Sequence, residues 1–242
     1  RFCAVLLAVW LATGIASAAK ETCTSPPYTD ATGQLSALMQ RLVATLAQFP
    51  SLRAALADQA PTLCLNDGLV EEQGYFEPKS NRIVLNAQIP QDFQLAILVH
   101  EVRHLQQFGS GACPTIGYRM ADYIRSRLAL EADASAIGVY VAWQLRAAGD
   151  LGPWETLQAW PTHEDLTARF AATMATGGDE VEATSATFAE WFARADRREL
   201  YTFAICSNYL DALDREKVVA GEATLPEDYA ARLCVLPDGR PY

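Results

Sequence analysis

Two histidines one helical turn apart are the residues of this chain whose types and spacing best fit a chemical role. His100 and His104 lie in the run 95–107, Leu-Ala-Ile-Leu-Val-His-Glu-Val-Arg-His-Leu-Gln-Gln, whose apolar residues recur at helical spacing. Residues four apart on a helix share one face, so the two imidazoles would stand about 6 Å apart and can both bind one zinc ion. Because an unpaired imidazole pair is costly to bury, we favour metal binding over a purely structural pair of histidines.

Glu101 follows the first histidine and is the candidate base. It lies too far round the helix to bind the metal well, but its carboxylate can hydrogen-bond a water molecule that the metal carries. Zinc lowers the pKa of such a water towards neutrality and polarises a carbonyl group, so that the glutamate can take the proton. The spacing His-Glu-x-x-His is typical of zinc peptidases.

A catalytic zinc site needs a third protein ligand, and Glu131 is the best candidate for it. It interrupts the apolar and small residues of the stretch 128–136, so its carboxylate is expected to face something that compensates its burial. Small residues on the same face would let a second helix approach closely. The alternative is an exposed glutamate paired with Arg127, four residues earlier.

Other residues near these motifs are weaker candidates for the ligand. Ser110 occupies the position, six residues after His104, where a metzincin would carry a further histidine, and we expect Cys113 to form a disulfide. Asp133 is the reserve ligand. It points to a different face from Glu131, and we expect it to support the site or to cap a neighbouring element.

These motifs resemble the gluzincin layout of zincin-fold metallopeptidases. The run from His100 to Gln107, together with Leu-Glu-Ala-Asp-Ala around Glu131, also resembles an uncharacterised bacterial family called the putative metallopeptidases. The resemblance covers residues 74–148 and implies a zincin-like core. In that core His100, His104 and Glu131 would hold zinc and Glu101 would act as the general base. Where gluzincins often carry Asp, four residues after Glu131, this chain has Ser135.

Hydrolysis of a peptide also needs a hydrogen-bond donor for the negative charge that develops on the carbonyl oxygen. The candidates are His163, Tyr118, Tyr123 and Tyr201, which the sequence does not rank. His163, the third histidine, could instead be an exposed residue in the first turn of a helix. Support of the metal ligands by Asp133 or Ser135 is a further expectation.

The elements expected to position these residues make an α+β, predominantly helical fold. Its zincin-like core would combine a small sheet or hairpin with an active-site helix and a ligand helix, followed by extra C-terminal helices. We expect one domain over residues 20–242, with its core at about 60–150 and a helical part at about 151–242. Helices are predicted at 34–49, 51–59, 92–108, 118–148, 162–175, 183–197 and 199–219, and strands at 62–65, 74–77 and 82–86.

Three local expectations complete this description. Residues 22–33 are rich in Thr, Ser, Pro and Gly and are predicted to be an exposed leader. Ser51 is the expected cap of the second helix. Strand 82–86 is expected to be the edge strand that pairs with an extended substrate beside the cleft.

Composition restricts the class of protein. The chain has 242 residues, of which 50% are hydrophobic and 20% charged, which excludes a disordered or fibrous protein. Its net charge of −10 argues against a nucleic-acid partner.

The N-terminus and the cysteines indicate export. Residues 1–19 combine Arg1, an apolar run and Ala-Ser-Ala, which predicts a cleaved secretory signal peptide, a membrane anchor being the alternative. We therefore expect a periplasmic or secreted protein with no stable membrane insertion after cleavage. Five cysteines would remain: Cys23, Cys64, Cys113, Cys206 and Cys234. This odd number predicts two disulfides of undetermined pairing and one thiol that is either free or bridged elsewhere.

The function expected from these features is that of an exported zinc metallopeptidase acting on a peptide or protein substrate. A catalytically silent, zinc-stabilised binding domain and a zinc amidase acting on a cell-envelope linkage are the alternatives. Glu101 favours catalysis, because a structural zinc site has no need of a general base. The substrate, the choice between endo- and exopeptidase action, and the oligomeric state stay open.

Overall fold

The computed structural model describes residues 20–70 and 72–242, so the expected signal peptide lies outside the described residues. The elements along the chain are β1 (Glu21–Thr24), α1 (Gly33–Leu46), α2 (Pro50–Gln59), β2 (Thr62–Asn66), β3 (Gly74–Glu77), β4 (Arg82–Asn86), α3 (Gln91–Gly109), α4 (Met120–Ala147), α5 (Gly152–Ala159), α6 (Glu164–Ala175), α7 (Glu180–Trp191), α8 (Ala195–Glu216) and α9 (Tyr229–Leu233). These elements confirm the α+β, predominantly helical class.

The sheet has the strand order β1-β2-β4-β3. β2 pairs in parallel with β4, with Cys64 opposite Val84, and the other two neighbouring pairs are antiparallel. The prediction that strand 82–86 is the edge strand is therefore wrong, because β4 is central and β3 is the edge. The burial of the strands gives the reason: four consecutive residues of β4 are buried, whereas β3 alternates between half-buried and exposed positions.

The N-terminal segment is more structured than its composition suggests. Residues 22–33 were expected to form an exposed leader, but Glu21–Thr24 forms β1, which pairs with β2. A disulfide joins Cys23 to Cys64, which lie directly opposite each other in this pair. Among the described residues Cys113, Cys206 and Cys234 are free, so the expected second bridge and the expected bridge at Cys113 are wrong.

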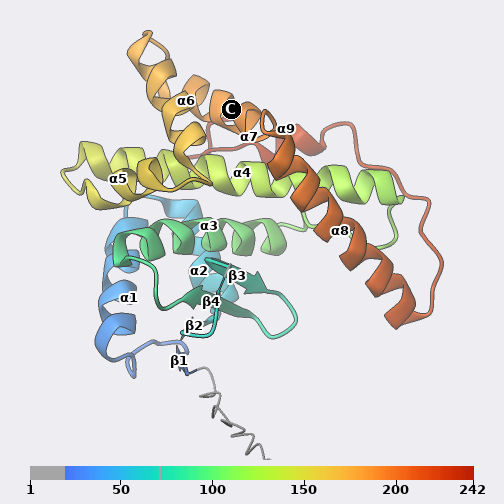
Figure 1. Cartoon of the computed structure of the whole chain (residues 1–242), viewed down its shortest axis with the longest axis horizontal. Helices are drawn as coiled ribbons and strands as arrows, with labels where there is room; N and C mark the ends of the chain where they lie inside the picture. The colour runs from blue at the N-terminus through green and yellow to red at the C-terminus, as the bar shows by residue number, and fades with distance from the viewer. Residues whose placement is uncertain (1–19, 71) are drawn as a thin grey trace, which may run out of the picture.

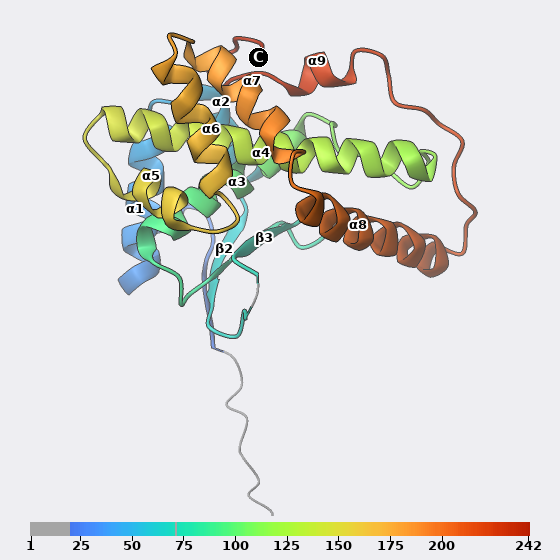
Figure 2. The same cartoon turned by 45° about the horizontal axis from the view of Figure 1, so that its top comes forward.

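The helices form layers on the sheet. α3 lies against β3 and β4, and α4 runs antiparallel to α3 on the side away from the sheet (Figure 1). α5 packs against both α3 and α4, and α6 and α7 pack on α4. α8 packs against α4 and crosses it at an angle (Figure 1), and a long loop returns the chain to α9 (Figure 2). Buried leucines of α1, α3 and β4 share one hydrophobic core. No described helix has the length and apolar character that crossing a membrane requires.

Several helix boundaries differ from the predicted ones for local reasons. α2 begins at Pro50, which needs no N–H partner in the first turn, and Ser51 is not its cap, since its buried hydroxyl has no hydrogen-bond partner. α5 was not predicted. α7 begins at Glu180 rather than at 183, because Asp179 and Glu182 form a reciprocal capping box.

Candidate metal centre

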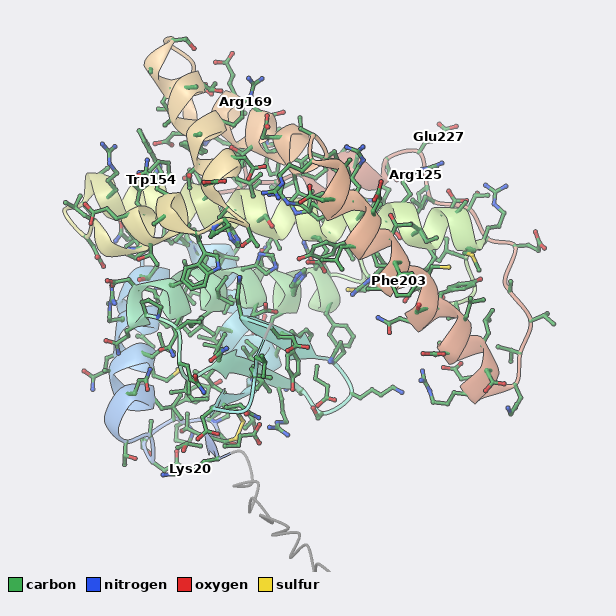
Figure 3. All side chains as sticks on the ribbon, in the orientation of Figure 1. Lys20, Arg125, Trp154, Arg169, Phe203 and Glu227 are labelled. Atoms are coloured by element: carbon green, nitrogen blue, oxygen red, sulfur yellow. A yellow bond between two sulfur atoms is a disulfide. The ribbon has the colours of Figure 1, made fainter. Side chains whose placement is uncertain are left out.

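The candidate site lies where α3 and α4 pack against each other. His100 and His104 are on α3, and Glu131 is near the middle of α4. Small residues let the two helices come close: a Cβ atom at Gly138 of α4 would lie 4.0 Å from the carbonyl oxygen of Ala96 in α3. Side chains fill the space between the two helices (Figure 3).

The structure brings the three predicted donors together. The Nε2 atoms of His100 and His104 are 3.0 Å apart, and Oε2 of Glu131 is 3.7 Å from the first and 3.5 Å from the second. Each of the three side chains is only 14–15% exposed. Glu131 thus faces the two histidines rather than solvent.

The charges of these side chains are strongly coupled. Burial alone would lower the pKa of His104, but the neighbouring Glu131 carboxylate raises this pKa to about 9. Burial likewise would raise the pKa of Glu131, but the charge of His104 and the hydrogen bonds from both histidines hold this pKa well below its usual range. The carboxylate therefore stabilises positive charge at the point where the two rings meet.

This donor set fits a divalent metal ion. Two imidazole nitrogens and one carboxylate oxygen are the protein ligands of a common class of catalytic zinc site. Ligand atoms about 2.0–2.1 Å from a tetrahedral ion lie roughly 3.3–3.4 Å from one another, by the geometry of such sites. The observed separations of 3.0, 3.5 and 3.7 Å bracket that spacing. A cation would also replace the positive charge that Glu131 now stabilises on His104.

Glu101 lies beside this cluster in a buried position, with 4% of its surface exposed. Burial raises its pKa, while the charges of His100 and His104 act in the opposite direction. The backbone of Phe76 in the edge strand β3 lies near this carboxylate and slightly lowers its pKa. The candidate base is therefore next to both the metal-binding side chains and the free edge of the sheet.

The four candidate donors to the negative charge on the carbonyl oxygen have different surroundings in the structure. Tyr201 of α8 packs its ring against Trp191: burial raises its pKa, and the negative charges of Glu131 and Glu101 raise it further. His163 lies at the start of α6 with its ring against Phe93 of α3, and burial, together with the charge of His100, lowers its pKa to about 3.

The other two tyrosines point elsewhere. Tyr123 precedes Glu131 by eight residues, roughly 12 Å along α4, and its ring packs against Tyr209. Tyr118 lies in the loop before α4, where it pairs with Ala223. Ser135 is buried in α4, one turn after Glu131.

A hydrogen-bond network extends from His104 to Asp133, which was expected to support the site, and it includes residues that the sequence analysis did not single out: Gln107, Arg103 and Tyr242. Nδ1 of His104 lies 2.7 Å from Oε1 of Gln107, and Nε2 of Gln107 donates to Asp133 at 2.6 Å. Arg103 forms a two-pronged ion pair with Asp133, and the hydroxyl of Tyr242 donates to the same carboxylate. The available signal was the presence of Arg103 and Gln107 in a helix whose neighbouring residues are apolar.

Comparison with known proteins assigns the chain to a family. Residues 16–242 match the family described as "Putative metallopeptidase family", and the chain belongs to that family. No curated protein and no solved structure matches the chain.

Proposed function

We propose that the protein is a zinc-dependent peptidase that hydrolyses peptide bonds in a peptide or protein substrate. The observation that carries the proposal is the convergence of His100, His104 and Glu131 within 4.8 Å of one another, with the buried Glu101 beside them. Membership of a metallopeptidase family supports the same conclusion.

In this proposal His100, His104 and Glu131 hold the metal and Glu101 is the catalytic base. Zinc bound there would supply a Lewis acid that polarises the scissile carbonyl group and acidifies the attacking water. Glu101 accepts the proton of that water and delivers it to the amine that leaves. Burial raises the pKa of Glu101, which makes its carboxylate a better proton acceptor than an exposed one.

Tyr201 is the proposed donor to the negative charge that develops on the carbonyl oxygen. Its raised pKa keeps the phenol protonated, so that it can donate a hydrogen bond near neutral pH. His163 carries no charge in that pH range, because its pKa is lowered to about 3, and it is proposed to line the site as a neutral imidazole.

The free edge of β3 is the proposed place for the substrate backbone. β3 is an edge strand, and the backbone of its residue Phe76 lies near enough to Glu101 to affect the pKa of that carboxyl group. An extended peptide paired with this edge would run past the base and the metal. The edge of β3 thus takes the role of pairing with the substrate that was expected of strand 82–86.

Export of the protein remains part of the proposal. Residues 1–19 have the composition of a signal peptide. The Cys23–Cys64 disulfide is consistent with an oxidising compartment such as the periplasm or the extracellular space.

The proposal is tested with the substitution Glu101→Gln, which removes the base but none of the three metal ligands. We expect about one zinc ion per chain in both proteins and hydrolysis of a peptide library by the wild type alone. Glu216→Gln, an exposed change at the end of α8, serves as the control and should cleave like the wild type.

Equal behaviour of the wild type and Glu101→Gln towards every peptide would contradict peptidase activity. Cleavage of cell-wall fragments, but of no peptide, by the wild type would favour the amidase alternative.

A further inference from the structure

The carboxylate of Asp133 is the most completely hydrogen-bonded group near the site. Asp133 is fully buried in α4. Its Oδ2 atom accepts hydrogen bonds from Nε of Arg103 at 2.7 Å and from Nε2 of Gln107 at 2.6 Å. Its Oδ1 atom accepts from Nη2 of Arg103 at 2.8 Å and from the hydroxyl of Tyr242. An ionised carboxylate only accepts hydrogen bonds, so each of these partners must donate.

The requirement that each partner of Asp133 donates fixes the orientation of the side-chain amide of Gln107. Its NH₂ group must face Asp133, and the same group donates to the carbonyl oxygen of Leu130 at 3.0 Å. Its oxygen therefore faces His104, 2.7 Å from Nδ1. An amide oxygen can only accept, so Nδ1 of His104 carries the proton. When a metal ion replaces the second proton of the ring, Nε2 is then the nitrogen whose lone pair is directed to the centre of the site.

The C-terminal residues 233–242, which begin at the end of α9, hold this arrangement in place. Nη2 of Arg103 donates to the carbonyl oxygens of Leu233 at 2.8 Å and Val235 at 3.1 Å. Val235 pairs with Pro241, and the backbone N–H of Tyr242 donates to the carbonyl oxygen of Cys234. The resulting small hairpin, residues 233–242, presents the Tyr242 hydroxyl to Asp133.

We propose that Asp133, Gln107 and Tyr242 are positioning residues for the metal centre, through which the 233–242 hairpin controls metal affinity. The inference rests on the proposed metal binding by His104. Asp133 sets the orientation of Gln107, Gln107 sets the tautomer and the ring orientation of His104, and Tyr242 completes the hydrogen bonds of Asp133. A ligand held in this way binds metal more tightly, because neither its ring nor its proton has to rearrange.

The test compares zinc affinity in Tyr242→Phe and Asp133→Asn with that of the wild type, by competition with a chelator of known affinity. Tyr242→Phe keeps the ring and removes only the hydroxyl. Asp133→Asn keeps the size but introduces a donor, which forces a rearrangement of Arg103 or Gln107. Tyr229→Phe is the matched control, because its hydroxyl donates to the carbonyl oxygen of Ala112 and not to this network.

We expect zinc affinity to fall by about 10–100-fold in Asp133→Asn, the range typical for groups that support a metal ligand. A several-fold fall is expected in Tyr242→Phe, and none in Tyr229→Phe. The cobalt-substituted protein should show an altered visible spectrum in the first two variants, which a purely structural role would not produce. Thermal unfolding of the metal-free proteins separates lost affinity from lost stability.

If Asp133→Asn fails to fold because Arg103 loses its partner, Tyr242→Phe still decides the question. A Tyr242→Phe protein that binds zinc and absorbs, as the cobalt form, like the wild type would overturn the inference while leaving the proposed function intact. Wild-type protein that binds no zinc would overturn both.

Discussion

His163 shows how burial alters the chemistry of a single side chain in this protein. Its imidazole packs edge-on against Phe93, and the causes that lower its pKa are burial first, followed by the positive charges of His100 and Arg197. Asp165 opposes them with a smaller effect in the other direction. The folded protein therefore keeps this ring neutral at pH values where an exposed histidine is charged.

This property predicts a loss of stability in acid. The pKa of His163 is about 3 in the folded protein, against 6.5 for an ordinary histidine, so between these values only the unfolded chain takes up the proton. Stability is unaffected above pH 6.5 and falls as the pH decreases towards 3. At pH 5 the cost reaches up to about 2 kcal/mol, since one pKa unit corresponds to about 1.4 kcal/mol.

The measurement is urea unfolding of the wild type and His163→Gln at pH 7 and pH 5, with a chelator present so that metal release adds nothing. We expect the wild type to lose more stability than the variant between the two pH values. An equal loss in the two proteins would show that His163 takes up its proton in the folded state as readily as in the unfolded chain.

At the scale of elements, the contact between β3 and α3 brings the sheet to the candidate base. Gly74, the first residue of β3, packs closely against strand β4 and helix α3. A Cβ atom there would be 2.7 Å from Cδ2 of Leu85 in β4 and 2.9 Å from Cγ2 of Ile97 in α3. Only a residue without a side chain lets the edge strand lie this close to the helix that carries Glu101.

Gly74→Ala is therefore expected to destabilise the protein by about 1–3 kcal/mol, as overpacking of a core does. It should also lower the peptidase rate, because moving β3 displaces the proposed substrate-pairing edge relative to Glu101. Urea unfolding and peptide hydrolysis measure the two effects. Glu216→Ala, an exposed change at the end of α8, is the control and should leave both unchanged. Unaltered stability of Gly74→Ala would disprove the close contact.

Local sequence signals were sufficient for most of the helical elements and for the three metal-binding candidates. The four-residue spacing of His100 and His104 defines one helix face from adjacent positions alone. Glu131 stood out because a carboxylate among apolar and small residues requires a partner. The nearest histidine to it in sequence is 27 positions away, so the sequence could suggest that the two helices meet but could not measure their separation.

Features of the whole molecule that depend on contacts between residues far apart in the sequence could not be predicted. β1 looked like a polar leader because its partner β2 follows about 40 residues later, and the pairing of Cys23 with Cys64 depends on that register. The hydrogen bond from Tyr242 to Asp133 spans 109 positions, and no local pattern marks either residue as the partner of the other. In each case a tertiary contact, and not an intrinsic propensity, decides the structure.

The central claim is that His100, His104 and Glu131 bind one zinc ion. Anomalous scattering at the zinc absorption edge, recorded from crystals of the zinc-loaded protein, tests it most directly. We expect a single peak about 2.0–2.2 Å from Nε2 of each histidine and from a carboxylate oxygen of Glu131. A zinc peak at another place in the protein, or one between the histidines with the Glu131 carboxylate turned away from it, would disprove this zinc site.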